Sequence, residues 1–329
     1  MPEIAARHVL RDTGAETVRG IVLVNICFFL LTVGDIATII ALPVAGVIGA
    51  MLGRGLLGGL TAAGLAYVHR GGDGRAAGLR RLVPVRWGQV MFRSVVHATA
   101  TLTWYVAWQL HMELADSYAL GYAAPLLIIL FAVPMLGERI TLRRGAATAV
   151  GFVGMLVMLR PGGDLWTPVS ALVLSGVVGM AFSRTMARVL ATTETPECLA
   201  FWLMASHVPV GLLMLLWFPA PGSSAVALAG LLVLGLTNGV AHWLHSRASA
   251  LAPMGALAPY EYTGMIWATV LGFLMWRQLP ELGTLAGAAV VAAAGLTNFL
   301  GEHRRRRAER VLAGGAAMPA AALAQRNDQ

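Results

Sequence analysis

The sequence contains no lysine, and charged residues make up only 12% of its 329 residues, whereas hydrophobic residues make up 57%. A soluble domain of this size carries about a quarter of its residues as charged side chains, most of them on its surface. That surface is missing here. The scarcity of charge therefore excludes an ordinary soluble globular protein, and most of the chain must face lipid.

Cysteine is also scarce. Cys27 and Cys198 are the two cysteines, and they lie far apart in apolar segments. Two lone cysteines without a local spacing motif give no metal or redox signature, so we interpret them as small buried hydrophobic residues. A phosphate loop, a nucleophile elbow and a zinc-protease helix motif are all absent from the sequence. We therefore expect no enzymatic activity, no metal and no cofactor.

Long apolar runs dominate what remains. A membrane-spanning helix needs about 20 mostly apolar residues. The runs between charges predict ten such helices, at 20–41, 44–68, 88–111, 115–137, 142–160, 167–189, 197–218, 225–247, 253–276 and 281–301. No small-residue cleavage site stands out in the first run, which favours a retained helix over a signal peptide. The fold class that we predict is an all-α polytopic membrane protein.

The 24 basic residues are all arginines, and they predict the orientation of the chain. The two tails and the loops on the same side of the predicted spans contain 20 arginines. This count places Arg184, Arg188 and Arg247 in such loops. Only Arg160 and Arg277 fall on the other side. Such asymmetry marks the cytoplasmic face, so we expect an inner-membrane protein with both termini in the cytoplasm. The arginines lie in loops and tails and do not form one basic face. This distribution argues against a nucleic-acid partner, which would require such a face.

An internal repeat is visible in segments 118–142 and 257–281, which both read as an apolar helix, a short polar corner and a glycine-rich helix. Aligning the corners pairs Tyr122 with Glu261. Because five spans per half is an odd number, the second copy must be inverted, as in many transporters. The predicted organisation is a cytoplasmic tail (1–19), a first five-helix repeat (20–161), a second five-helix repeat (162–301), and a basic, then disordered cytoplasmic tail (302–329).

Several short motifs carry a family resemblance. They are Ala124-Pro125-Leu126, Leu136-Gly137-Glu138-Arg139, Gly151-Phe152-Val153-Gly154, Arg160-Pro161-Gly162, Tyr262-Thr263, Trp267-Ala268 and Leu271-Gly272. In this order, over about 20–301, the chain resembles the EamA-type members of the drug/metabolite transporter superfamily. The resemblance implies ten helices in two inverted repeats and secondary transport of a small solute.

Within that superfamily the chain looks most similar to bacterial importers of S-adenosylmethionine or riboflavin. Such proteins often have an Asp and, four residues later, a Lys in their first helix. Here Asp35 is present, but Ile39 stands at the Lys position. The second repeat also has Arg277 where the corner glutamate would be. The resemblance therefore does not fix the substrate.

Ionisable residues at membrane depth are the main functional signal, because burying them in hydrocarbon costs several kcal/mol. Glu261 is the only charged residue between Arg247 and Arg277, near the predicted midplane. We expect it to couple protons or bind a cation in a central cavity; a structural carboxylate is the alternative. Asp35 and Arg54 have no charge between them, which predicts a buried pair, either structural or part of a substrate site or gate.

The span 88–111 carries a stripe of polar and aromatic residues on one helical face: His97, Thr101, Trp104, Trp108 and His111. Lipid disfavours His and Thr, so this face is predicted to look inward. Aromatic walls suit flat or cationic ligands through stacking and cation–π contact. Helix packing with an interfacial tryptophan is the alternative. Near the start of the same span, Arg93 is expected to extend towards the membrane surface.

The remaining candidates come from three other spans: Asn238 and His242 on one, Tyr118 and Tyr122 on another, and Tyr260 and Trp267 beside Glu261. His242 and His245 lie close in sequence but lack a nearby Cys or acid, so a polar, water-lined or proton-relay face is favoured over a metal site. For Tyr260 and Trp267, core packing is an equally good interpretation.

Together these features predict a secondary active transporter that works by alternating access. Its expected partners are a small organic solute, the lipid bilayer, and protons or a counter-solute; a homodimer is left open. An amino acid, an S-adenosylmethionine-like or flavin-like solute, or a drug would each fit, in either direction. The alternatives are a non-transporting membrane scaffold or sensor, which needs no central cavity, and a channel, against which the inverted repeat argues.

Overall fold

A computed structural model gives the structure of the chain. It describes residues 14–68, 77–112, 114–121, 123–137 and 167–277, with isolated helical positions at 142, 145–146, 149–150, 152–153, 286, 289–290 and 293. The predicted spans 142–160 and 281–301, most of both tails, and Tyr122 therefore lie almost wholly outside the described residues.

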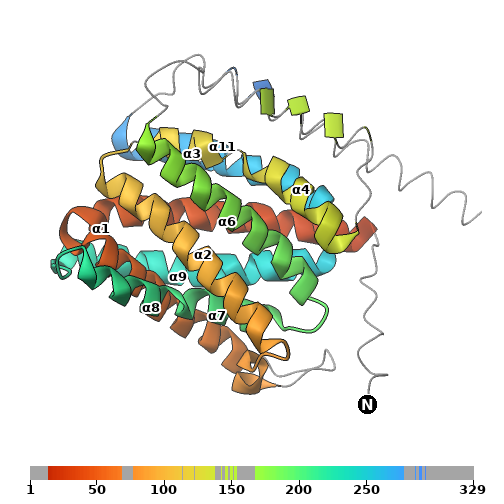
Figure 1. Cartoon of the computed structure of the whole chain (residues 1–329), viewed down its shortest axis with the longest axis horizontal. Coiled ribbons are helices and arrows are strands. Elements are labelled where there is room, and N and C mark those ends of the chain that lie inside the picture. Colours follow the sequence, from red (N-terminus) through yellow and green to blue (C-terminus); the bar gives the residue numbers. More distant parts are fainter. Residues whose placement is uncertain are drawn as a thin grey trace, which may run out of the picture.

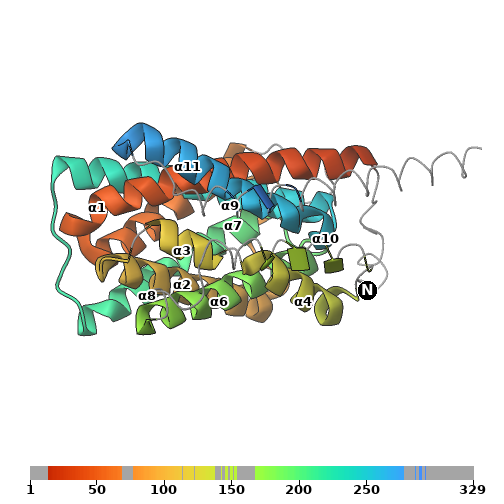
Figure 2. The ribbon, with the colours of Figure 1, turned by 90° about the horizontal axis from the view of Figure 1, so that it is seen from above.

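Every regular element among the described residues is helical. The elements are α1 (Gly14–Val68), η1 (Gly78–Leu82), α2 (Trp87–Gln109), α3 (Leu114–Gly121), α4 (Ala124–Leu136), α6 (Pro168–Leu190), α7 (Pro196–Ala205), α8 (His207–Leu213), η2 (Met214–Leu216), α9 (Ala225–Leu251), α10 (Met254–Leu257), η3 (Ala258–Tyr262) and α11 (Thr263–Trp276). Figures 1 and 2 show them as a bundle. The prediction of an all-α fold is confirmed over this part of the chain.

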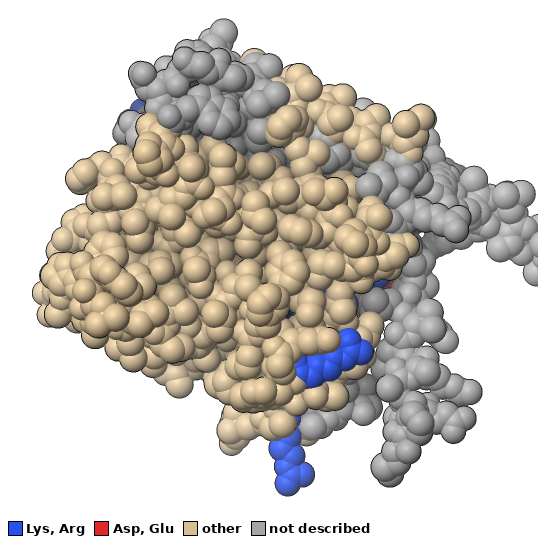
Figure 3. Space-filling model, viewed as in Figure 1, with Lys and Arg blue, Asp and Glu red and all other residues tan. Residues whose placement is uncertain are grey.

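Four helical stretches in the described residues are long and apolar enough to cross a membrane: Glu16–Val68, Pro168–Leu190, Pro196–Leu216 and Ala225–Leu251. The first has 53 residues. At 1.5 Å per residue it measures about 80 Å, which is enough for two crossings of a hydrocarbon core about 30 Å thick. Leu56, Leu60 and Leu228 are more than half exposed on these stretches, as lipid-facing side chains are. The face in Figure 3 is almost free of charge, and most of its visible arginine lies towards the lower edge.

The long helix α1 reverses direction at Gly46, as its path in Figure 1 shows. Gly46 has φ 63° and ψ −179°, a conformation that suits glycine and breaks the helix. The sequence placed the break slightly earlier, around Pro43, which instead lies inside the first limb. The turn is held from outside, since the Gly222 amide donates to the Val44 carbonyl over 3.0 Å.

Small residues bring the helices into close contact. Helix α9 runs along both limbs of α1, and a Cβ on Gly34 would lie 2.2 Å from the Asn238 amide nitrogen. Further along the same contact, a Cβ on Gly235 would lie 3.0 Å from the Gly53 carbonyl oxygen. Glycine at such positions lets two helix backbones approach closely. In lipid, where no hydrophobic effect drives helices together, this close packing stabilises their association. On the other side of the bundle, α6 packs against α2 and α4.

Three predicted spans are interrupted in the structure. Span 115–137 consists of α3 and α4, with Pro125 in the first turn of α4. Span 197–218 changes from α7 to α8 at Ser206, just before Pro209. Span 253–276 contains α10, the 3₁₀ turn η3 with Pro259 in its first turn, and α11. Proline lacks an amide hydrogen and cannot continue a helical ladder, which accounts for breaks beside these prolines.

The sequence placed several arginines wrongly. Arg184 and Arg188 lie inside α6, and Arg247 lies inside α9, because both helices continue through these positions to Leu190 and Leu251. Arg188 donates to the Ser249 carbonyl over 2.7 Å, so it ties α6 to α9 instead of marking a cytoplasmic loop.

Arg93 does not extend to the membrane surface either. Its side chain is buried in α2 and donates to the Ser183 carbonyl over 2.9 Å and to the Leu199 carbonyl over 3.1 Å. Backbone carbonyls of α6 and α7 thus satisfy the guanidinium inside the bundle, and Arg93 joins three helices.

Candidate functional site

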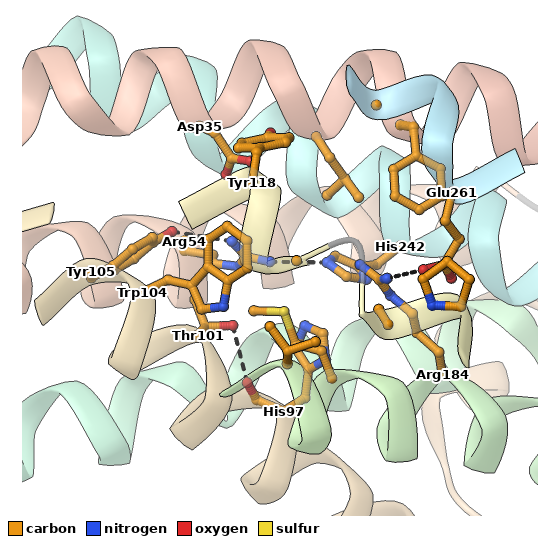
Figure 4. Close-up of a pocket in the computed structure, with 18 of the residues that line it drawn as sticks. Asp35, Arg54, His97, Thr101, Trp104, Tyr105, Tyr118, Arg184, His242 and Glu261 are labelled. Carbon is orange, nitrogen blue, oxygen red and sulfur yellow. Dashed lines mark hydrogen bonds and ion pairs between the residues drawn. The ribbon is translucent and has the colours of Figure 1, made fainter. Parts of the chain in front are cut away.

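A cavity of about 100 Å³ opens between α1, α2, α3, α4, α6, α9, η3 and α11. Eight of the twelve residues selected from the sequence line it: Asp35, Arg54, His97, Trp104, Trp108, Tyr118, His242 and Glu261. Figure 4 shows most of these side chains converging from different helices. The cavity also has apolar wall residues, among them Phe28, Val177 and Met180.

Arg54 lines the cavity from the second limb of α1. Its Nη1 donates to the Tyr105 hydroxyl over 3.1 Å, and its Nη2 lies 3.0 Å from Nε2 of His242. A guanidinium can only donate, so Nε2 of His242 accepts this bond and the imidazole is neutral with its hydrogen on Nδ1. This contact connects the second limb of α1 to α9. Tyr105 was not selected from the sequence, although it lies four residues after Thr101, on the border of the polar face of the same span.

Asp35 and Arg54 do not form the buried ion pair that the sequence suggested. The Asp35 carboxylate instead accepts a hydrogen bond from the Tyr118 hydroxyl over 2.5 Å. The reversal of α1 at Gly46 brings both residues to one cavity, but each takes a tyrosine as its partner. Two opposite charges thus face the same space with uncharged partners.

Glu261 forms an ion pair with Arg184 of α6. Glu261 lies in the 3₁₀ turn η3 and is 7% exposed, while the Arg184 guanidinium carbon lies 5.3 Å from the centre of the Phe28 ring. Arg184 is the main functional candidate that sequence reasoning missed. The signal was available, because Arg184 falls inside the predicted span 167–189 and five residues before its end.

Aromatic side chains of α2 form one wall. The Trp104 ring makes edge contacts with Trp108 and Tyr118, at centroid distances of 5.9 and 6.0 Å. Its position is set by two glycines, because a Cβ on Gly121 would lie 2.9 Å from Trp104 Cη2 and a Cβ on Gly176 would lie 3.2 Å from Cδ1. Close packing against Gly121 and Gly176 therefore fixes the position of the Trp104 indole in the wall.

Three histidines from three helices meet beside Arg54. The His97 ring lies 5.0 Å from that of His242 and 6.0 Å from that of His207. Both ring nitrogens of His97 are buried and lack a hydrogen-bond partner in the part of the chain that the structure describes. Within that part, no group of three or more His, Cys, Asp or Glu side chains is arranged to hold a metal ion. The cluster therefore offers unused hydrogen-bonding groups.

Three of the selected residues lie outside the cavity lining. Asn238 donates to the Leu234 carbonyl over 3.0 Å and sits against Gly34, where it packs α9 on α1. Trp267 packs on Phe29 at a centroid distance of 5.1 Å. Tyr260 packs against an apolar cluster. On this side of the cavity it is Gly264 that contributes to the wall.

Comparison with known proteins agrees with this architecture. No family model matches the chain. A riboflavin transporter of Rhizobium johnstonii is 30% identical over 217 residues, which cover 65% of this chain and 71% of that protein. An S-adenosylmethionine uptake transporter of Rickettsia prowazekii is 25% identical over 56% of this chain and 62% of its own length.

One further relative and one solved structure are also similar to this chain. A pseudopaline exporter of Pseudomonas aeruginosa is 26% identical over 62% of this chain and 72% of that protein. A solved crystal structure aligns with 87% of this chain and 98% of its own chain, at a TM-score of 0.70 and 19% sequence identity. At that identity the structural likeness concerns the fold alone.

An apolar helical bundle around a cavity that is lined in part by charged side chains defines a multi-pass membrane protein. With the relatives above, the chain belongs to the drug/metabolite transporter superfamily, among its EamA-type members. It is a bacterial small-molecule transporter, and its relatives are transporters and not enzymes.

Proposed function

We propose that this protein is a secondary active transporter that carries a small organic metabolite across the inner membrane by alternating access. The observation that carries the proposal is the cavity itself. Charged side chains of Asp35, Arg54, Arg184 and Glu261 line one cavity inside an apolar bundle, and charged groups that border a cavity at membrane depth are typical of a solute or ion path. A scaffold or sensor would need no such space.

The packing of the helices supports an inverted repeat. In a chain of two five-helix repeats, each span corresponds to the span five places later, so α2 corresponds to α9 and the first limb of α1 corresponds to α6. Helix α2 packs on α6, and α9 packs on α1. Likewise α4 packs on α6, and α11 packs on α1. Exchanging the two proposed repeats maps each contact onto its counterpart.

The interrupted helices support the same symmetry. One break lies between α3 and α4, and the other is the 3₁₀ turn between α10 and α11, close to the positions that the repeat alignment pairs. Both helices that follow end on a residue with positive φ, Gly137 at 65° and Arg277 at 55°. Discontinuous helices at matching places in two halves are a feature of transporter binding sites.

Rocking of one repeat against the other would change the contacts that cross between them. The hydrogen bond between Arg54 and His242 joins the two proposed repeats at the cavity. The buried ion pair of Arg81 and Glu197 joins them outside the cavity. Opening the cavity to the opposite side must break or move at least one of them. Solute movement would be coupled to protons or to a counter-solute, and Glu261 is the proposed coupling carboxylate.

The test is uptake into proteoliposomes over a panel of amino acids, S-adenosylmethionine, riboflavin and cationic dyes, with and without a pH gradient. The proposal expects saturable uptake of at least one solute that depends on the gradient or on a trans solute. A lack of solute-dependent flux from correctly folded protein would favour a scaffold or sensor. Flux that does not saturate would favour a channel.

A further inference from the structure

Three side chains that face the cavity have buried nitrogen atoms that no group in the described part of the chain bonds. They are Nε of Arg54, the indole Nε1 of Trp104, and both ring nitrogens of His97. Arg54 and Trp104 supply only donors, and a neutral imidazole supplies one donor and one acceptor. A buried donor without a partner destabilises the structure that contains it. A solute rich in acceptor atoms would remove that destabilisation.

Among the charged residues that line the cavity, Arg54 bonds the Tyr105 hydroxyl and the His242 ring, and both of these partners are uncharged. Arg184 is balanced by Glu261. Because uncompensated charge is costly inside a bundle, a negatively charged group of the solute would stabilise the occupied state.

The same place offers a flat apolar surface. Gly121 and Gly176 lie against one edge of the Trp104 indole, and the rings of Trp108 and Tyr118 are nearly perpendicular to it. Indole faces bind other aromatic rings by offset stacking and burial of apolar area. Trp104 and Arg54 both line the cavity (Figure 4), so an aromatic ring and a charged group of one solute can be bound together.

Building on the transport function proposed above, we propose that the transported solute is a flat aromatic molecule with a single anionic group. The anionic group is a carboxylate or a phosphate. Its oxygens accept hydrogen bonds from Arg54 Nε, Trp104 Nε1 and a ring nitrogen of His97, and its ring lies on the aromatic wall. Asp35 repels a second anionic group, since its carboxylate faces the same cavity.

The test uses three probes that share one ring and differ in charge: indole-3-acetate, tryptophol and tryptamine. Equilibrium dialysis of labelled probe against the full-length protein in lipid nanodiscs measures binding without transport. Indole-3-acetate is expected to bind about tenfold or more tightly than tryptophol, as for a hydrogen bond to a charged group, and tryptamine is expected to bind most weakly. Equal binding of all three, or tighter binding of tryptamine, would overturn the proposal.

Phenylacetate and phenyl phosphate, dialysed in the same way, distinguish the two anionic groups. The group that binds more tightly identifies the chemistry that the site takes, and the proposal requires that at least one of them binds more tightly than benzyl alcohol. If neither does, the anion site is wrong.

Variants locate the site. Arg54→Gln should reduce the preference for indole-3-acetate over tryptophol to about twofold or less, because the charge and Nε are removed together. Trp104→Phe keeps an aromatic ring and removes one donor, and should weaken the preference by about threefold to tenfold. Arg247→Gln is the matched control, since Arg247 is exposed and lies over the Trp243 ring outside the cavity. Retention of the full preference in both cavity variants would place the anion elsewhere and overturn the assignment.

Binding and transport can fail separately. If indole-3-acetate binds as expected but no anionic aromatic solute, indole-3-acetate included, enters proteoliposomes, the binding site stands and the transport proposal fails. If a neutral or cationic solute is transported and the dialysis shows no anion preference, the transport proposal stands and the inference about the solute fails.

Discussion

Two buried ion pairs of this chain have similar chemistry and different surroundings. Arg81 of η1 pairs with Glu197 of α7 over 3.0 Å, with both side chains at most 2% exposed. Arg184 pairs with Glu261 beside the cavity, and the Arg184 side chain is 15% exposed. The first pair is enclosed by protein, whereas the second borders an open space.

The two ion pairs also differ in the other hydrogen bonds that their residues form. Glu197 also accepts a bond from Trp243 Nε1 over 3.0 Å, and Thr195 donates to the backbone carbonyl of Arg81 over 2.7 Å. This arrangement joins η1 to α7 and α9. Glu261 has Arg184 as its bonded partner and lies in a helix break. The comparison indicates that buried charge in a membrane bundle is structural where it is saturated with protein partners, and is available for function where it borders a cavity.

The largest expected effect on stability is from Arg81→Met. Removing one partner leaves Glu197 as a buried charge without its cation, which costs about 3–5 kcal/mol. We expect the detergent-solubilised protein to lose its monodisperse peak at a clearly lower temperature, while uptake per folded molecule is retained. Unchanged thermal stability together with lost uptake would reverse the roles that we assign to the two pairs.

Glu261→Gln should have the opposite profile. Uptake should fall by about tenfold or more, as when a hydrogen bond to a charged group is lost, while thermal stability falls much less than in Arg81→Met because water in the cavity can solvate Arg184. Proteoliposome uptake and the temperature series on the same preparations measure both quantities. Normal uptake by this variant would remove Glu261 from the mechanism.

Tyr105→Phe tests the orientation of Arg54 with a smaller change. The variant loses one 3.1 Å bond to the guanidinium and keeps the ring. The solute concentration for half-maximal uptake should rise by about threefold to tenfold. Tyr67→Phe, at an exposed tyrosine outside the cavity, is the control and should match the unchanged protein. An effect of equal size in both variants would contradict a specific role for Tyr105.

Gly121→Ala should have the smallest effect of the series. The added methyl group would lie 2.9 Å from Trp104 Cη2 and would displace the indole from its position in the cavity wall. We expect about a twofold to fivefold loss of apparent affinity for the solute, within the range for modest overpacking. In Gly64→Ala the new Cβ has no atom within 4 Å, so uptake should be unchanged. An unchanged apparent affinity of the Gly121→Ala variant for the solute would show that the position of Trp104 does not affect solute binding.

The sequence predicted the helical class and several helix ends well. The predicted span 167–189 corresponds to Pro168–Leu190, and 88–111 corresponds to Trp87–Gln109, because charges and turn residues bound these apolar runs. It could not place the reversal of α1 at Gly46, since a glycine adopts positive φ only where the packing demands it. The helix breaks likewise depend on tertiary packing around the prolines.

The polar residues of the cavity could be predicted because ionisable residues stand out in an apolar span. Their partners could not, since pairing depends on how the helices cross. Asp35 binds Tyr118 instead of Arg54, and Arg184 was assigned to a loop although it pairs with Glu261. Asn238, on the polar face of its helix, packs against Gly34 instead of lining the cavity. Polarity in the sequence thus identifies buried faces but does not tell a cavity from a tight helix crossing.

The most direct test of the central claim is whether the cavity opens to each side of the membrane in turn. Thr101→Cys places a thiol in the cavity wall, and replacing the buried Cys27 and Cys198 by alanine removes the background. Vesicles of known orientation are treated with a membrane-impermeant thiol reagent from either side. The account predicts modification from both sides, slowed by a transported solute. Modification from one side only, or none in folded protein, would contradict it.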